Sequence, residues 1–250
     1  MSARDPLLPP RRLETGGSVR PPWRLRGPGL SVWLVQFRMA LRRYTPEELL
    51  ATFRTVRKGV STAHFFGSPK HQRTKDMWCA AHFASGYGGT LGGCAVWFDA
   101  AGTDTDTDFE LEVSGTRFPF QTTMVKTSGR RIGDEYKLPH AERPRHNDLS
   151  VGAELGPAWA LDEIQKKIGK MYSAVDRLNL LLYLNFPAWQ QDYREYQAVC
   201  RDAASRFASV WLLNGNALCV LHANPAIPAF DGWLPIGQNV WWDEDGLAES

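Results

Sequence analysis

The sequence predicts an α/β fold, an α/β/α sandwich in which helices cover a central mixed β-sheet on both sides. Two observations lead to this class. Segments with the apolar spacing of amphipathic helices alternate along the chain with short apolar or strictly alternating runs, which are typical of strands. Residues 178–186 are almost continuously apolar, as expected of a strand that is covered on both faces.

The composition is that of a globular protein. The chain has 250 residues, of which 43% are hydrophobic and 22% are charged, so we expect a sizeable core and no wholesale disorder. Its four cysteines lie in apolar runs with no closely spaced pair, which favours buried, reduced thiols. No apolar run reaches the ~20 residues of a membrane span, and no secretory signal is evident. We therefore expect a cytoplasmic protein without a membrane partner.

The near-neutral formal net charge of +2 conceals two biased ends. Residues 1–45 contain nine Arg and two acids, whereas residues 223–250 contain five acids and no Lys or Arg. We divide the chain into a disordered basic extension (1–29), a single α/β domain (30–222) and an acidic tail (223–250).

The acidic tail carries three large aromatic residues, Trp233, Trp241 and Trp242. They could form a docking surface for a protein partner, or they could pack back on the domain's own core. The sequence leaves the oligomeric state open.

The first predicted elements are helical. Residues 30–43 have the pattern of a basic amphipathic helix. A second helix is expected over 46–58, because Thr45 is a good N-cap and Pro46 suits the first helical position. A third, over 75–85, is expected to end at the glycine-rich run 86–93.

Strands follow over 94–98, 108–113 and 117–125, with a tight turn at Ser114-Gly115 between the second and third. A polar connection over 127–157 is longer than ordinary loops, which indicates a functional or mobile segment. The remaining predicted elements are a lysine-rich helix 159–171, the apolar strand 178–186, a helix 192–207, and a hairpin of 210–213 with 217–222 around Asn214-Gly215.

Several common site types are absent from the sequence. The histidines form no HExxH motif, the cysteines lack zinc spacing, and no GxSxG motif occurs. The glycine-rich run 86–93 follows a predicted helix and precedes a strand. That is the reverse of the order that presents backbone amides to a phosphate.

The predicted strands 108–113 and 117–125 carry a more informative pattern. Asp108 opens one strand, and Gln121, Thr122 and Thr123 lie on the next. Hydrolysis of a phosphodiester with Mg²⁺ needs oxygen ligands that converge on the metal and a nearby cation. A hairpin can supply such ligands. Solvated turn and strand residues would show the same pattern.

In these residues and in its element order over 75–186, the chain resembles the PD-(D/E)xK, or restriction-endonuclease-like, superfamily. The core of that family is helix, three strands, helix, strand. Asp108 matches the family's aspartate at the second strand, Gln121 stands in place of the acid, and Thr123 stands in place of the lysine. The ammonium could come instead from Lys126, or from Lys166, Lys167 or Lys170, and Asp76 could add an accessory carboxylate.

The resemblance implies a divergent nuclease-like protein that uses Mg²⁺ or Mn²⁺ to hydrolyse DNA or RNA. The implied metal ligands are Asp108, Gln121, the Thr122 carbonyl and Asp76, and the implied catalytic positions are Asp108, Gln121, Thr123 and Lys126. The alternative is a catalytically inactive nuclease-fold module that binds nucleic acid or a protein partner.

Basic residues flank the candidate site on both sides, as phosphate contacts would require. The predicted nucleic-acid contacts are Arg130, Arg131, Lys166, Lys167 and Lys170. Further basic residues precede the site: Arg54, Arg57, Lys58, Lys70, Arg73 and Lys75.

Overall fold

The computed structural model describes residues 41–100, 106–139, 142, 149–170, 174–186, 188, 192–215 and 217–236. All of them belong to one of two compact units, Met39–Ser250. The predicted extension 1–29, most of the predicted helix 30–43, and Trp241 and Trp242 lie outside the described residues.

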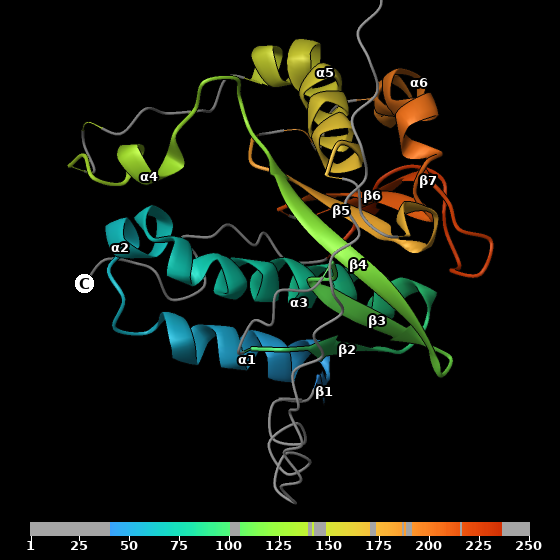
Figure 1. Ribbon diagram of the computed structural model, residues 1–250, viewed down its shortest axis with the longest axis horizontal. Helices are drawn as coiled ribbons and strands as arrows, with labels where there is room; N and C mark the ends of the chain where they lie inside the picture. Colours follow the sequence, from blue (N-terminus) through green and yellow to red (C-terminus); the bar gives the residue numbers. More distant parts are fainter. Residues whose placement is uncertain are drawn as a thin grey trace, which may run out of the picture. The chain divides into compact units, whose positions relative to one another are not determined.

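The described residues form a mixed α/β fold around one central sheet of eight strands, as the sequence predicts (Figure 1). The strands are β1 (Arg42–Tyr44), β2 (Cys94–Phe98), β3 (Phe109–Val113), β4 (Thr116–Val125), β5 (Asn179–Leu184), β6 (Ser209–Asn214), β7 (Ala217–His222) and β8 (Leu234–Pro235). They lie side by side in chain order.

The direction of pairing changes at β4. Strands β1 to β4 pair antiparallel, β4, β5 and β6 pair parallel, and β6, β7 and β8 pair antiparallel again. A parallel pair needs a crossover connection, and a helix is the usual way to make one. The chain between β4 and β5 accordingly contains a long helix, and so does the chain between β5 and β6.

The helices are α1 (Pro46–Arg57), α2 (Thr62–Gly67), α3 (Gln72–Leu91), α4 (Ile132–Glu135), α5 (Leu149–Ile168) and α6 (Tyr193–Ala204), with short 3-10 turns η1 (Pro69–His71) and η3 (Val175–Arg177). Two apolar clusters fill the space between helices and sheet. One joins α1 and α3 to one face, and the other joins α5 and α6 to the opposite face of β5 to β7. All six residues of β5 are buried, which confirms the prediction of a strand covered on both faces.

Helix α1 starts and ends as predicted, because Thr45 and Glu48 form a capping box around Pro46. Helix α3 is longer than predicted and continues through most of the glycine-rich run. The reason is close packing. A Cβ atom on Gly86 would lie 2.9 Å from Ile236 Cγ1 and 3.0 Å from Leu218 Cδ1, so the close approach of these side chains accounts for a glycine inside the helix.

The predicted connection 127–157 is partly helical. Its first part carries α4, which packs against α2. A Cβ atom on Gly133 would lie 3.1 Å from Gly67 Cα, so the two backbones are in contact there. The Phe66 and Tyr136 rings stack beside this contact at 4.2 Å. Helix α5 begins at Leu149 and contains Pro157, so the predicted helix start at 159 was wrong.

Two further predictions need correction. The expected helix 30–43 cannot include Arg42 and Arg43, because these residues pair with β2 as part of β1. In the last hairpin, Asn214 pairs with Ala217, so it ends the strand and is not a loop residue. Strand pairing extends one residue further than the Asn-Gly signal suggested.

Part of the acidic tail packs on the domain. Ile227 is buried, Phe230 lies 5.9 Å from the Trp211 ring, and β8 extends the sheet beside β7. Trp233 is partly buried against the cluster of α5 and α6. Two roles were considered for the tail tryptophans, and Trp233 has the second of them: it packs on the domain's own core.

Candidate functional site

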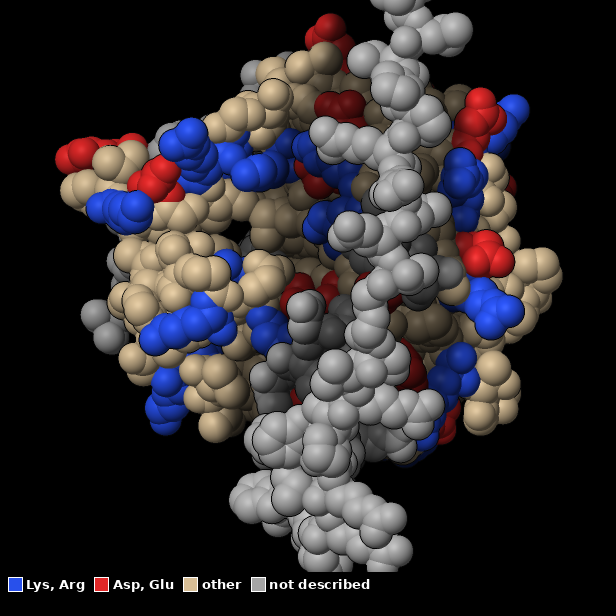
Figure 2. Space-filling view, in the orientation of Figure 1, with Lys and Arg blue, Asp and Glu red and all other residues tan. Residues whose placement is uncertain are grey.

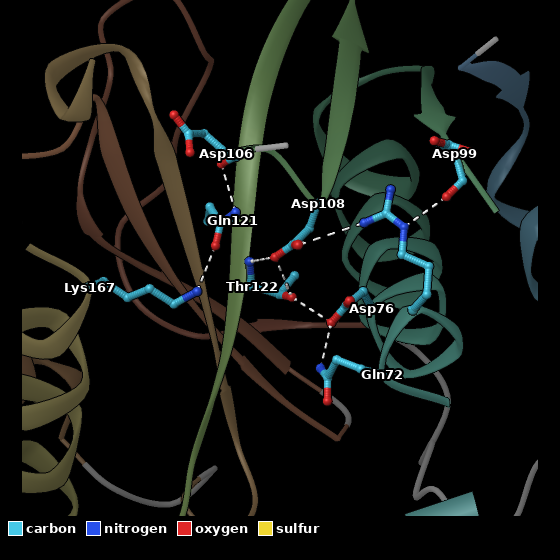
Figure 3. Close-up of polar contacts among 9 residues, drawn as sticks. Gln72, Asp76, Asp99, Asp106, Asp108, Gln121, Thr122 and Lys167 are labelled. Atoms are coloured by element: carbon cyan, nitrogen blue, oxygen red, sulfur yellow. Dashed lines mark hydrogen bonds and ion pairs between the residues drawn. The ribbon is translucent and has the colours of Figure 1, made fainter. Parts of the chain in front are cut away.

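Two carboxylates meet at Thr122, in the middle of the sheet (Figure 3). Asp76 comes from α3, and Asp108 lies directly before β3. The Thr122 hydroxyl is 2.9 Å from Asp76 Oδ1 and 3.0 Å from Asp108 Oδ2. The Thr122 backbone N–H donates to Asp108 Oδ2 at 2.6 Å. Antiparallel pairing of Phe109 with Phe120 holds Asp108 beside this part of β4.

Asp76 and Asp108 share the Thr122 hydroxyl, so the two carboxylates have few hydrogen-bond donors between them. A hydroxyl has one proton, so Thr122 can donate to only one of the two carboxylates at a time. Burial and the charge of Asp108 together raise the pKa of Asp76 from 3.8 to about 6, against the opposing effect of hydrogen bonds from Thr122 and Gln72. Asp76 is only 6% exposed. Burial and the neighbouring carboxylate therefore disfavour the charged form of Asp76.

A guanidinium lies at the outer side of Asp108. Arg73 Nη1 is 3.7 Å from Asp108 Oδ1, and Arg73 Nε donates to the Asp99 carbonyl oxygen at 2.7 Å. The guanidinium also lies over the Phe98 ring, 4.3 Å from its centroid. These contacts fix the direction in which Arg73 approaches the site.

On the other side of β4, a lysine from α5 reaches Gln121. Successive residues of a strand point to opposite faces, so Thr122 faces Asp76 while Gln121 faces α5 (Figure 3). Lys167 Nζ donates to Gln121 Oε1 at 2.6 Å, and Gln121 Nε2 donates to the Asp106 carbonyl oxygen at 2.7 Å. Gln121 is thereby held in one orientation.

Lys167 is an unusual lysine because it is only 8% exposed. Burial lowers the pKa of Lys167, and the charge of Lys170 lowers it further, while the charges of Asp108 and Asp76 act in the opposite direction. Asp108 thus links the carboxylate pair at Thr122 with the Lys167–Gln121 contact on the other side of β4. It bonds to Thr122 and is the strongest charge acting on Lys167.

The structure brings together five of the sequence-predicted positions: Asp76, Asp108, Gln121, Thr122 and Lys167. The others lie apart from this group. Thr123 is half-buried further along β4, and Lys126 and Lys170 are exposed. Lys166 pairs with Glu163 at 2.7 Å.

The two predicted arginine contacts differ from each other. Arg130 forms a bidentate pair with Glu135 and donates to the Asn185 carbonyl oxygen at 2.8 Å, so it anchors the segment after β4. Arg131 is exposed. Only Arg131 is therefore presented to solvent as a surface contact would be.

Sequence reasoning did not assign Gln72 and Arg73 to the site. Both lie one helical turn before Asp76, at i−4 and i−3, so they share its face of α3. Gln72 Nε2 donates to Asp76 Oδ1 at 3.0 Å. The helical spacing from Asp76 was the signal that could have identified them.

The donors at the carboxylate pair suit a hard divalent cation. Within the described residues, Asp76 Oδ2 accepts no hydrogen bond and Asp108 Oδ1 has only the 3.7 Å contact with Arg73. Carboxylate and other oxygen ligands are what Mg²⁺ and Mn²⁺ prefer. The described residues contain no cluster of three or more His, Cys, Asp or Glu side chains, so neutral oxygens would have to complete the coordination.

Comparison of the chain with protein-family models, with curated proteins and with solved structures finds no match. Among the described helices, none combines the length and the apolar character that crossing a membrane requires.

Proposed function

We propose that this protein is a divergent metal-dependent nuclease of the PD-(D/E)xK type that hydrolyses phosphodiester bonds in DNA or RNA. The order of the central elements, α3, β2, β3, β4, α5 and β5, supports this proposal. It is the helix, three strands, helix, strand order of that superfamily, with the short α4 inserted before α5.

The observation that carries the proposal is the contact between Lys167 and Gln121, next to Asp108. The superfamily places an aspartate, an acid and a lysine on neighbouring strands. Here Asp108 and Gln121 occupy the first two positions, and an ammonium reaches Gln121 from α5 at 2.6 Å, although Thr123 stands in the lysine's usual place. A buried lysine that faces an amide oxygen is costly for stability, which favours a functional reason for it.

Asp76 and Asp108 would hold Mg²⁺ or Mn²⁺, with the Thr122 carbonyl as a further ligand. A bound cation would polarise the scissile phosphate and lower the pKa of a bound water. The chain's own part is to fix the two carboxylates through Thr122 and to hold the Lys167 ammonium through Gln121, where it can orient the attacking water. Arg73 supplies positive charge beside Asp108.

The test is cleavage of end-labelled DNA and RNA oligonucleotides by the full chain with Mg²⁺ or Mn²⁺, and with EDTA as the metal-free control. We expect cleavage only with metal, and a loss of about 100-fold or more in Asp108→Ala. Metal-dependent cleavage that is unchanged in Asp108→Ala would exclude this site.

A catalytically inactive module with the same fold is the second candidate. The observation that favours it is Gln121, because a neutral amide replaces the acid of the superfamily. This candidate predicts salt-dependent binding of nucleic acid without turnover in either metal, or binding of a protein partner alone.

A further inference from the structure

A long stretch of the chain before the candidate site contains no acidic residue. Between Glu48 and Asp76 there are 27 residues with six Lys or Arg, two His and no Asp or Glu. The whole chain has 27 acids in 250 residues, so a stretch of this length would contain about three by composition alone. Exposed faces that serve only solubility usually mix both signs of charge.

The fold gathers the exposed members of this stretch at one end of the molecule's helical layer. The end of α1, the whole of α2 and the start of α3 lie together (Figure 1). Four basic side chains in this region are exposed and form what we call the basic patch: Arg54, Lys58, His64 and Lys70. Lys58 and Lys70 form no ion pair with any described residue, so their charges face solvent.

Buried contacts hold the basic patch in place from below. Arg57, which is 4% exposed, donates to Thr62 Oγ1 at 3.0 Å and lies over the Phe65 ring. The His64 and His71 rings are in contact at 5.2 Å. These contacts tie α2 to the end of α1 and to η1, so the patch is a formed surface and not a loose tail.

The groups around His71 repel one another electrostatically. Burial lowers the pKa of His71, and the neighbouring charges of His64, Lys70, Lys75 and Arg57 lower it further. Concentration of like charge costs stability unless an opposite charge is brought in. An anion bound at this surface would relieve the repulsion.

The space-filling view shows a hollow between the part of the molecule that carries α2 and the part that carries α4 and α5 (Figure 2). Figure 2 shows Lys and Arg side chains on both flanks of this hollow, over α2 and the neighbouring helix ends on one side and over α4 and α5 on the other, with acidic side chains deeper inside. Lys75, on α3, lies over the Phe65 and Phe66 rings of α2 and immediately precedes Asp76 in the chain. The last member of the patch, Lys70, lies six residues before Asp76 in the chain, so the patch and the carboxylate pair adjoin the same end of α3.

We propose that the basic patch binds the phosphate backbone of the nucleic-acid strand on one side of the bond to be cleaved. This proposal rests on the proposed function, because it takes the carboxylate pair as the place of cleavage. The chemistry favours a nucleic acid over a membrane surface. Phe65 and Phe66 are buried, so the patch offers cations without the exposed aromatic groups that insert into lipid.

The experiment measures binding of a fluorescent single-stranded and a duplex oligonucleotide in EDTA, where the proposed hydrolysis cannot proceed. Affinity is recorded over a range of NaCl concentrations for the full chain and for the double variant Lys58→Glu/Lys70→Glu. We expect affinity to fall at least about tenfold at low salt, and the slope of log K against log[salt] to decrease by about 2.

The matched control is Arg201→Glu/Arg206→Glu, which makes the same charge change at two exposed positions, one in the last turn of α6 and one just after it. It should leave both quantities close to those of the unaltered chain. Equal losses in the two double variants would overturn the proposal, because net charge alone would then explain binding. Binding of phosphatidylserine vesicles, but not of oligonucleotides, through Lys58 and Lys70 would overturn it as well.

Failure of this inference can be told apart from failure of the proposed function. If the unaltered chain never cleaves in Mg²⁺ or Mn²⁺ but loses oligonucleotide binding in Lys58→Glu/Lys70→Glu, the surface is correct and the hydrolysis is not. If the chain cleaves with metal and the double variant binds as tightly as before, the surface is wrong and the hydrolysis stands.

Discussion

The Lys167 ammonium donates a hydrogen bond to the Gln121 amide oxygen at 2.6 Å, although the two residues are 46 positions apart. Parallel pairing of β4 with β5 requires the chain to cross over the sheet, and α5 is part of that crossover. The crossover therefore delivers a lysine to β4 that the strand itself lacks at Thr123.

We predict that Lys167→Met abolishes most of the metal-dependent cleavage while leaving nucleic-acid binding nearly intact. The expected loss in kcat is about 100-fold or more, because the ammonium that orients the water is removed. The control is Lys166→Met, whose lysine is exposed and paired with Glu163. Single-turnover rates measure both variants, and equal rates for the two would exclude a role for Lys167.

Gln121→Glu should make the site more like that of the superfamily. A carboxylate at this position would pair with Lys167 and add negative charge next to Asp108, so we expect Mn²⁺ affinity to rise about tenfold. Titration calorimetry measures this affinity directly. Gln165→Glu introduces the same change at an exposed position of α5 and should have little effect. Weaker metal binding in Gln121→Glu would contradict a site at the Asp76 and Asp108 pair.

Asp76 should make the metal-free protein less stable as pH rises. Its folded-state pKa of about 6 lies above the ordinary value of 3.8, so the folded protein holds this proton more tightly than the unfolded chain does. The resulting contribution is present in full below pH 3.8 and is lost as pH rises through about 6, and it amounts to about 3 kcal/mol.

Asp76→Asn removes this dependence, so its free energy of unfolding relative to the unaltered chain should be higher at pH 8 than at pH 4. Urea unfolding in EDTA at the two pH values measures the difference. Asp162→Asn, at an exposed position of α5, should change stability by less than about 0.5 kcal/mol at both. An Asp76→Asn effect of the same size at pH 4 and pH 8 would show that Asp76 does not titrate in this range.

Gly86→Ala should destabilise the fold by about 1 to 3 kcal/mol, because the added Cβ would press on the side chains of Ile236 and Leu218. Gly89 provides the control on the same helix, since nothing lies within 4 Å of its Cβ position. Gly89→Ala should stabilise α3 by up to about 1 kcal/mol. Thermal unfolding that ranks Gly86→Ala at or above Gly89→Ala would mean that β7 and Ile236 do not pack on α3 as described.

Local patterns predicted most of the elements correctly. Capping at Thr45 and alternation in β3 are local signals, and the corresponding elements begin and end within one residue of their expected positions. The glycine-rich run misled the prediction because its cause is not local. Gly86 is required by contacts with Leu218 and Ile236, which are more than a hundred residues away.

The candidate site was predictable only in part, because some of its residues follow from local patterns and others from contacts between distant elements. Asp108 and Gln121 were identified from neighbouring strands of one hairpin, and Asp76 from the preceding helix. Choosing Lys167 among the three candidates Lys166, Lys167 and Lys170 requires the rotation of α5, which depends on how Ile164 and Ala160 pack on the sheet. Arg73 was missed as a site residue although its i−3 spacing places it on the same face of α3 as Asp76; only its contact with the Asp99 carbonyl oxygen has no local signal.

The backbone contact between Gly67 and Gly133 joins α2 to the segment that leaves β4. Because no side chain separates the two backbones, α2 and α4 cannot slide past each other without losing the contact, and the stacked Phe66 and Tyr136 rings restrict rotation as well. The two basic flanks of the hollow are therefore coupled mechanically at this joint. Any residue larger than glycine at position 133 would place a Cβ atom 3.1 Å from Gly67 Cα and push α2 and α4 apart.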